Sequence, residues 1–322
     1  MEKYGKVRRR VQNLISELPP ENRSLVDCEF HVSPKATVDE LTTTHSQEYV
    51  QRFMVGDQDE QELRNVGFPW SPEGVDRATS STGGTLTAAR TVLEAATGDA
   101  SRTCWAAHCA GGTHHAFFDR GEGFCVFSDM AVAANCILKE YPTIVKKILF
   151  VDLDVHQGNG NAVLFQDNPS VFTFSVHCSG NFFSQPEVSD LDVSLPPDTN
   201  DATYLVTLNH WLKRLRNEGL FDLVFYQAGV DALKEDRLGR MALTARGLER
   251  RNQLVFDFCY EQNLPLVICM GGGYPRTSDW SPIIEAHSNV YFQAHQYLAN
   301  MSTSETKATA ITSSTQTTGQ KE

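Results

Sequence analysis

The chain has 322 residues, enough for one large α/β domain or two smaller ones with a sizeable core, which excludes a disulfide-stapled miniprotein. Its apolar fraction of 41% and charged fraction of 21% are typical of folded globular proteins and exclude a disordered or collagen-like chain. The formal net charge of -12 repels phosphate backbones, so we expect no direct nucleic-acid partner.

Membrane and secretory signals are not visible in the sequence. No apolar run approaches the roughly 18 residues that a membrane helix needs, and the first ten residues, MEKYGKVRRR, are too charged for a secretory leader. We therefore expect no membrane association and a location in the nucleus or the cytoplasm. The eight cysteines form no C-x-x-C pair, and several stand in apolar runs, so they are predicted to be buried hydrophobic residues rather than disulfides or a zinc knuckle.

The first predicted element is an amphipathic helix, because apolar residues recur at helical spacing over residues 7–18 before Pro19-Pro20 ends the pattern. Its Arg8-Arg9-Arg10 run is more simply a solvated face than a targeting or nucleic-acid patch. Asp201 and Thr244 precede two later amphipathic stretches and are predicted to cap them. The later predicted helices span residues 85–96, 129–140, 202–217 and 245–262.

Five short apolar runs alternate with these helices and are predicted to be strands. They span residues 104–109, 148–153, 171–176, 223–228 and 264–270. Near-continuous apolar strands indicate burial on both faces, so the predicted fold class is α/β, a single-domain parallel sheet sandwiched by helices over residues 1–300. Residues 301–322 are rich in Ser and Thr, and we expect a disordered tail there.

Polar side chains follow every one of the five apolar runs. The segments are Gly111-Gly112-Thr113-His114-His115, Asp152-Leu153-Asp154-Val155-His156, Ser175-Val176-His177, Gly229-Val230-Asp231 and Gly271-Gly272-Gly273-Tyr274. In an open parallel sheet the functional crevice lies outside the carboxyl ends of the strands. The sequence therefore predicts that all five segments converge on one site.

Asp154, His156 and Asp231 form a predicted metal-ligand set. Two carboxylates and one imidazole suit a borderline divalent ion, and three protein ligands leave a position open for water or substrate, as in catalytic zinc sites. If the chain stays extended, Asp152 lies on the same side as Asp154 and His156. A lone D-x-H would more often cap a helix or satisfy a loop, but five converging strand ends make that interpretation less favourable.

The neighbouring residues supply what metal-assisted hydrolysis needs, namely a base, an acid and an oxyanion donor. His114 and His115 are the predicted proton carriers, and the glycines at 111 and 112 allow the tight backbone turn before them. Tyr274 follows three glycines, so its hydroxyl is predicted to hydrogen-bond the developing oxyanion.

The motifs G-G-T-H-H-A (111–116), D-L-D-V-H-Q-G-N-G (152–160), F-S-V-H (174–177), A-G-V-D (228–231) and G-G-G-Y (271–274) stand in this order. Together they resemble the zinc-dependent histone deacetylase superfamily, from the first helix to about residue 300. The G-F-P-W-S stretch (67–71), the M-E-K-Y start and Asn159 look most like the class IV branch and its bacterial relatives. The resemblance implies the arginase/deacetylase α/β fold.

The same resemblance implies a role for each matching residue. Asp154, His156 and Asp231 would hold one catalytic zinc ion, while His114, supported by Asp152, and His115 would act as a pair in proton transfer. Tyr274 would polarise the amide carbonyl. The narrow substrate channel would be lined by Phe124, Phe183, Gly112 and Gly272. A structural potassium ion would bind Asp152 and Ser175.

Two departures from the family pattern stand out. Asn159 occupies a position where class I members have aspartate, and a neutral amide stabilises a protonated His115 less than a carboxylate would. We therefore expect the pKa of His115 to be lower than in class I. Class IV relatives usually also have a short strand-containing segment before the M-E-K-Y start, so we expect either that the fold tolerates the missing edge or that the sequence is truncated.

The predicted function is zinc-dependent hydrolysis that removes acetyl or longer acyl groups from lysine side-chain amides of proteins such as histones. Chromatin regulation and corepressor partners would follow from it. One alternative is deacylation of small acylated amines such as polyamines. Another is a non-catalytic, deacetylase-like scaffold, which is disfavoured because the water-activating and oxyanion groups are all present. An arginase-type manganese pair is also disfavoured, since it needs a carboxylate-rich two-metal cluster.

Overall fold

The computed structural model describes residues 2–20, 28–98, 104–181 and 185–316. Its centre is a six-stranded parallel sheet in the order β1-β6-β5-β2-β3-β4. The strands are β1 (Trp105–His108), β2 (Ile148–Asp152), β3 (Val171–Cys178), β4 (Leu191–Leu195), β5 (Leu223–Gln227) and β6 (Leu266–Cys269). The predicted α/β fold with a parallel sheet between helices is therefore confirmed.

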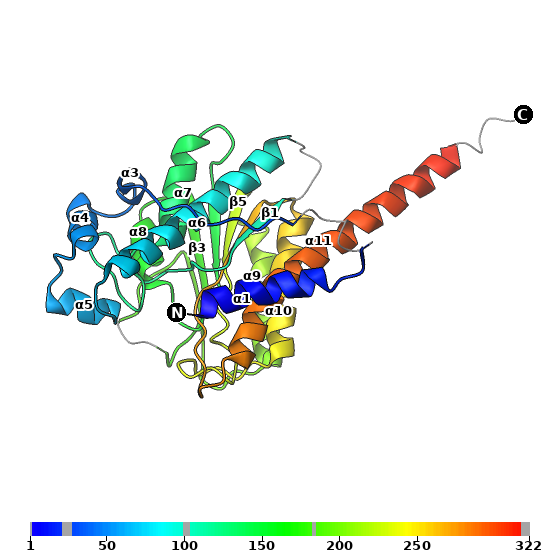
Figure 1. The fold of residues 1–322 in the computed structure, drawn as a ribbon. Helices are drawn as coiled ribbons and strands as arrows, with labels where there is room; N and C mark the ends of the chain where they lie inside the picture. The colour runs from blue at the N-terminus through cyan, green and yellow to red at the C-terminus, as the bar shows by residue number, and fades with distance from the viewer. Residues whose placement is uncertain (1, 21–27, 99–103, 182–184, 317–322) are drawn as a thin grey trace, which may run out of the picture.

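Ten helices of the described residues surround or flank this sheet (Figure 1). They are α1 (Lys3–Ser16), α3 (Val38–Leu41), α4 (Gln47–Val55), α5 (Glu60–Val66), α6 (Pro72–Gly98), α7 (Asp129–Glu140), α8 (Asn159–Phe165), α9 (Asp201–Leu215), α10 (Ala245–Glu261) and α11 (Ser281–Gln316). None of the helices in the described ranges is long and apolar enough to cross a membrane.

Alternate residues of the central strands enter two separate cores, as the two-residue period of a strand requires. In β2, Ile148 and Phe150 pack with α4, α6 and α7, whereas Leu149 and Val151 pack with α1, α9, α10 and α11. Both faces are therefore covered by helices, which explains why the strands have near-continuous apolar sequences. Figure 1 shows the two helical layers on either side of the strands.

Several boundaries differ from the predicted ones for identifiable reasons. Helix α6 begins at Pro72, well before residue 85, and the buried hydroxyls of Thr79 and Thr82 donate to the Val75 and Ala78 carbonyls within the helix. This Ser/Thr-rich turn lacks the apolar pattern that indicates a helix. Strand β4 was not predicted because its sequence, LDVSL, alternates polar and apolar residues at the sheet edge.

Two capping and burial predictions also need correction. Thr244 caps α10 as predicted, but the cap of α9 is Asn200, and the Asp201 carboxylate instead accepts from the backbone N–H and hydroxyl of Thr244. Five of the cysteines are buried and Cys104 and Cys109 are partly buried, but Cys28 is exposed. The burial prediction is therefore wrong for Cys28.

The predicted tail begins at residue 301, whereas α11 continues to Gln316. No proline or glycine stands between residues 283 and 318, so the sequence contains no residue that stops the helix there. Residues 317–322 lie outside the described part of the chain.

Candidate metal centre and active site

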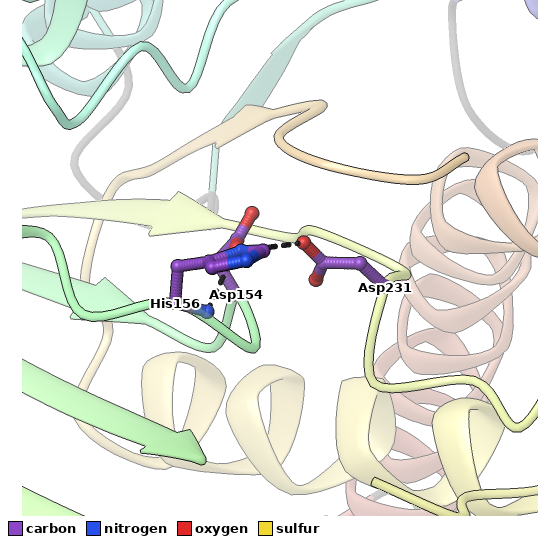
Figure 2. Close-up of side chains that lie close together, drawn as sticks. All are labelled: Asp154, His156 and Asp231. Carbon is purple, nitrogen blue, oxygen red and sulfur yellow. Dashed lines mark hydrogen bonds and ion pairs between the residues drawn. The ribbon is translucent and has the colours of Figure 1, made fainter. Parts of the chain in front are cut away.

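The predicted ligands Asp154, His156 and Asp231 meet at the carboxyl ends of β2 and β5. Figure 2 shows the first two side chains rising from the loop after β2 and the third approaching from the loop after β5. His156 Nδ1 lies 3.1 Å from Asp154 Oδ1 and 3.3 Å from Asp231 Oδ2, and one ligand atom from each residue lies within 4.8 Å of the others. The three side chains could thus hold one metal ion.

The loop after β2 is a turn rather than the extended chain that strand alternation predicted. The strand ends at Asp152, and the Asp154 N–H donates to Asp152 Oδ1 over 3.2 Å. The His156 N–H in turn donates to Asp154 Oδ1 over 3.1 Å. The acidic side chains therefore hold the turn that presents the imidazole to the neighbouring carboxylates.

Hydrogen bonds from neighbouring loops and strands fix both ligand carboxylates. Asp154 Oδ2 accepts from Gln227 Nε2 at 2.8 Å and from the Gly272 N–H at 2.9 Å. Asp231 Oδ1 accepts from the Val155 N–H at 2.9 Å, while its buried Oδ2 accepts no well-formed hydrogen bond from the described residues. A Cβ at Gly272 would collide with Asp231 Oδ2, so this glycine packs directly against the ligand carboxylates.

The charges of this set favour a divalent cation. Burial and the neighbouring Asp154 charge raise the pKa of Asp231 to about 7. Burial lowers the pKa of His156, but the two carboxylates outweigh burial and raise it to about 10. In the protein alone, protons therefore balance the buried negative charge, and a divalent ion can take their place. Two oxygen donors and one nitrogen donor fit zinc.

His114 and His115 lie side by side next to this set, with ring centroids 4.0 Å apart. His114 Nδ1 is 2.6 Å from Asp152 Oδ2, and His115 Nδ1 is 2.6 Å from Asn159 Oδ1. Since both acceptors are oxygens, each ring carries its hydrogen on Nδ1 and its lone pair on Nε2 when neutral. Both rings are thus oriented in the form that accepts a proton at Nε2.

The two histidines differ in charge because their partners differ. Burial lowers the pKa of His114, but the charges of Asp152 and Asp154 outweigh burial and raise it to about 9. Burial, together with the positive charges of His114 and His156, holds the pKa of His115 well below its ordinary range. His115 is therefore neutral and can accept a proton, whereas His114 is the charged member of the pair.

Tyr274 follows the glycine loop after β6. Its N–H donates to Asp236 Oδ2 at 2.5 Å and its carbonyl accepts from the Arg237 N–H at 2.8 Å, which fixes the backbone at this point. Burial and the charges of Asp154 and Asp231 raise its pKa well above the ordinary value. The phenol therefore keeps its proton and can donate a hydrogen bond toward the site.

The predicted channel residues occupy different places. The Phe124 ring is about half exposed and lies 5.8 Å from the Tyr274 ring, at the rim of the site. Gly112 packs against the Gly271 backbone, where a Cβ would come within 2.7 Å of its nitrogen. Gly272 borders the ligand carboxylates rather than an apolar wall. Phe183 lies outside the described residues.

The predicted potassium ligands stand on neighbouring strands. Asp152 and Ser175 are register partners on β2 and β3, and the Ser175 hydroxyl hydrogen-bonds His177 Nδ1 at 2.9 Å. The structure thus brings both side chains to the same sheet edge as the candidate metal ligands.

Two further residues support the site and were not predicted. Gln227 ends β5 and holds Asp154 Oδ2, and its polarity at the end of an apolar run was a signal that could have identified it. Arg251 of α10 is fully buried and donates to the Leu153 and Gly229 carbonyls, in the loops that carry the ligands. Only the fold brings this arginine there, so the sequence gives no comparable signal.

Comparisons with known proteins agree with the geometry. The family model for the Histone deacetylase domain matches residues 5–291 of this chain. The chain is 43% identical over 236 residues to an uncharacterized protein of Picosynechococcus sp., covering 73% of this chain and 75% of that protein. It is 31% identical to Histone deacetylase 2 of Arabidopsis thaliana over 61% of this chain and 49% of that protein. It is 28% identical to the acetoin utilization protein AcuC of Bacillus subtilis over 75% of this chain and 66% of that protein.

Solved structures share the fold. An HDAC homologue in complex with SAHA superposes with a TM-score of 0.70 at 22% identity, over 91% of this chain and 77% of that chain. An HDAC homologue from Aquifex aeolicus gives 0.69 at the same identity and coverage. With the family match spanning most of the sequence and the motif residues gathered at one sheet edge, the chain belongs to the histone deacetylase family.

Proposed function

We propose that this protein is a zinc-dependent deacylase that removes acetyl or longer acyl groups from lysine side-chain amides of proteins. The observation that carries the proposal is the Asp154, His156 and Asp231 set, which can share one ion, together with the His115 ring, whose centroid lies 6.0 Å from that of the His156 ring. A divalent ion at those three residues would supply Lewis-acid polarisation of the amide carbonyl and a lowered pKa for a water molecule.

The residues of the chain then divide the proton transfers. His115 accepts the proton of the attacking water at Nε2, while Asn159 holds its Nδ1–H and so fixes the tautomer. The charged His114, paired with Asp152, stabilises the negative charge that develops and can return a proton to the leaving lysine nitrogen. The Tyr274 hydroxyl donates to the developing oxyanion.

The rim of the site supports an apolar acyl-lysine chain as substrate. Phe124 presents an exposed ring at the entrance, and its backbone is tied to the Val66 carbonyl by a 2.9 Å hydrogen bond. Flat aromatic surfaces favour an aliphatic chain. We also propose that Asp152 and Ser175 bind a structural potassium ion and that the chain belongs to the class IV branch.

The test is release of free lysine from matched acetyl-lysine and myristoyl-lysine peptides, with an acetylated polyamine as a third substrate. We expect turnover of at least one peptide, its loss with a zinc chelator and its return when zinc is added. Turnover of the polyamine alone would replace the protein substrate with a small amine. A folded, zinc-loaded protein that hydrolyses none of the three would contradict the proposal.

A further inference from the structure

A second buried carboxylate, Asp129, holds the backbone turn that precedes the histidine pair. It is the first residue of α7 and is fully buried. Its Oδ1 accepts from the Thr113 N–H at 2.7 Å, and its Oδ2 accepts from the Gly112 N–H at 3.0 Å and from the Thr85 hydroxyl at 2.5 Å. The two backbone hydrogen bonds come from the two residues immediately before His114, and the third comes from α6.

The turn is shaped around this carboxylate. Gly111 and Gly112 have φ values of 76° and 78°, in the left-handed region that favours glycine. A Cβ at Gly111 would collide with Asp129 Oδ2, so the backbone can wrap the carboxylate only with glycine at this position. No lysine or arginine in the described ranges forms an ion pair with Asp129, so its partners at this turn are hydrogen-bond donors.

A chain of hydrogen bonds connects Asp129 to Ser33, and the donor and the acceptor of each bond can be deduced. The Thr85 hydroxyl has one proton and donates it to Asp129, so it must accept from His108 Nδ1, which lies 3.1 Å away. His108 Nε2 then accepts from the Ser33 hydroxyl at 3.1 Å. The relay therefore runs from Ser33 through His108 and Thr85 to Asp129.

The packing around His108 leaves room for its ring in this relay. Its ring lies over Gly84 of α6, where any Cβ would collide with Nε2. Burial lowers its pKa to about 4, so the ring is neutral and, with its hydrogen on Nδ1, its Nε2 accepts from Ser33. Ser33 stands in the extended chain before α3, which crosses α6 and is tied to it by the Ala36 N–H donating to the Thr79 carbonyl at 2.9 Å (Figure 1).

We propose that Asp129 is a positioning residue for the reaction, which sets the His114-His115 pair through the Gly112 and Thr113 amides and is itself oriented by the Ser33-His108-Thr85 relay. This inference rests on the proposed deacylase function. Asp129 does not touch the reacting groups. Its loss changes the placement of the histidines while the residues of the metal set remain in place.

The first comparison uses matched substitutions at Thr85 in the full chain. Thr85→Val removes the hydroxyl with little change in volume, and Thr85→Ser keeps it. We expect Thr85→Val to lower kcat per zinc by about tenfold to a hundredfold, the usual loss for residues that orient catalytic groups, with KM and zinc content unchanged. Thr85→Ser should recover most of kcat, and Ser33→Ala should cause a smaller loss than Thr85→Val.

The control for loss of a buried threonine hydroxyl is Thr82→Val, one turn earlier in α6. The Thr82 hydroxyl is also buried, but it donates only to the Ala78 carbonyl of the same helix. We expect Thr82→Val to lower the melting temperature without lowering kcat. If Thr82→Val and Thr85→Val lower kcat equally, or if neither lowers it, the relay has no positioning role.

A second measurement does not depend on activity. Asp129→Asn replaces an acceptor oxygen by an amide nitrogen that cannot accept from N–H groups. Hydrogen–deuterium exchange of a peptide covering residues 110–117 should therefore become faster in Asp129→Asn than in wild type and Thr82→Val, at equal zinc content. Unchanged exchange would overturn the proposal. An inactive wild-type enzyme would refute the proposed function, and this exchange measurement would still decide whether Asp129 holds the turn.

Discussion

His115 Nδ1 lies 2.6 Å from Asn159 Oδ1, so this ring, the base in the proposed reaction, is oriented by a neutral amide rather than by a carboxylate. Its neighbour His114 has the opposite arrangement, with Asp152 as its partner. Since a carboxylate stabilises imidazolium and an amide does so only weakly, the two rings hold different charges at neutral pH. Two adjacent histidines therefore differ in charge: His115 is neutral and His114 is protonated.

Asn159→Asp should raise the pKa of His115 by placing a negative charge on its Nδ1–H. Because His115 must be neutral to accept a proton, the acidic limb of the profile of kcat/KM against pH should move to higher pH. Asn168→Asp, the same change on the loop before β3, should leave the limb in place. An unchanged limb in Asn159→Asp would show that another group controls it.

Tyr274→Phe removes one donor to the oxyanion and leaves the metal ligands intact. We expect zinc content to remain at the wild-type level while kcat falls by roughly 10²–10³, the typical loss for one such donor. The measurement is kcat per bound zinc. Turnover at the wild-type rate would exclude the phenol from the reaction.

His156→Ala and Asp231→Ala each remove one member of the metal set. Zinc content and lysine release should fall together in both variants, because two remaining side chains cannot replace a three-residue site. His31→Ala, at an exposed histidine outside the site, provides the matched control. Full zinc occupancy with normal turnover in either site variant would rule out the assigned ligand set.

Zinc should stabilise the fold more strongly as the pH rises. The pKa values of His114 and His156 in the folded protein are about 9 and about 10, above the ordinary 6.5. Their bound protons therefore stabilise the metal-free fold below pH 6.5, and this contribution disappears as the pH rises through 9 and 10. Bound zinc would take the place of the proton on His156. The stability of the zinc-loaded fold would therefore not fall when that proton is lost.

The measurement is the melting temperature of zinc-loaded and metal-free protein between pH 6.5 and 9. We expect the difference between the two forms to increase across this range. A constant difference would mean that protons do not balance the charge of the metal-free site.

Arg251→Met should destabilise the protein, because it leaves the buried Leu153 and Gly229 carbonyls without their donors. Hydrogen bonds to a charged group contribute about 1.5–3 kcal/mol each, so the free energy of unfolding should fall by roughly 3 kcal/mol or more. Urea unfolding measures this difference, with Arg250→Met at an exposed neighbouring position as control. Equal stability of the two variants would show that Arg251 has no structural role.

The strands and most of the site could be predicted because apolar runs and the polar residues that end them are adjacent in sequence. This local pattern is enough to predict Asp154, His156 and Asp231 as one ligand set. The pattern could not show the turn after Asp152, since that turn depends on hydrogen bonds to side chains. It also could not identify Arg251 or Asp129, because neither follows a strand in the sequence and only the fold places α10 and α7 against these loops.

The same limit explains the missed elements. Strand β4 alternates polar and apolar residues because only one of its neighbours is a strand, so it has no continuous apolar run. The first half of α6 buries threonines whose hydroxyls bond within the helix. In both cases tertiary surroundings, rather than local composition, determine the structure.

The packing of α1 against α11 has a consequence for synthesis on the ribosome. The apolar face of α1, with Val7 and Val11, is synthesised long before its partner, a helix that begins at residue 281. Strand β1 likewise pairs only with β6 among the described strands, so it stays unpaired while the intervening chain is made. Until residue 266 has been synthesised, both surfaces therefore lack their partners, and these are the sites where chaperones are expected to bind.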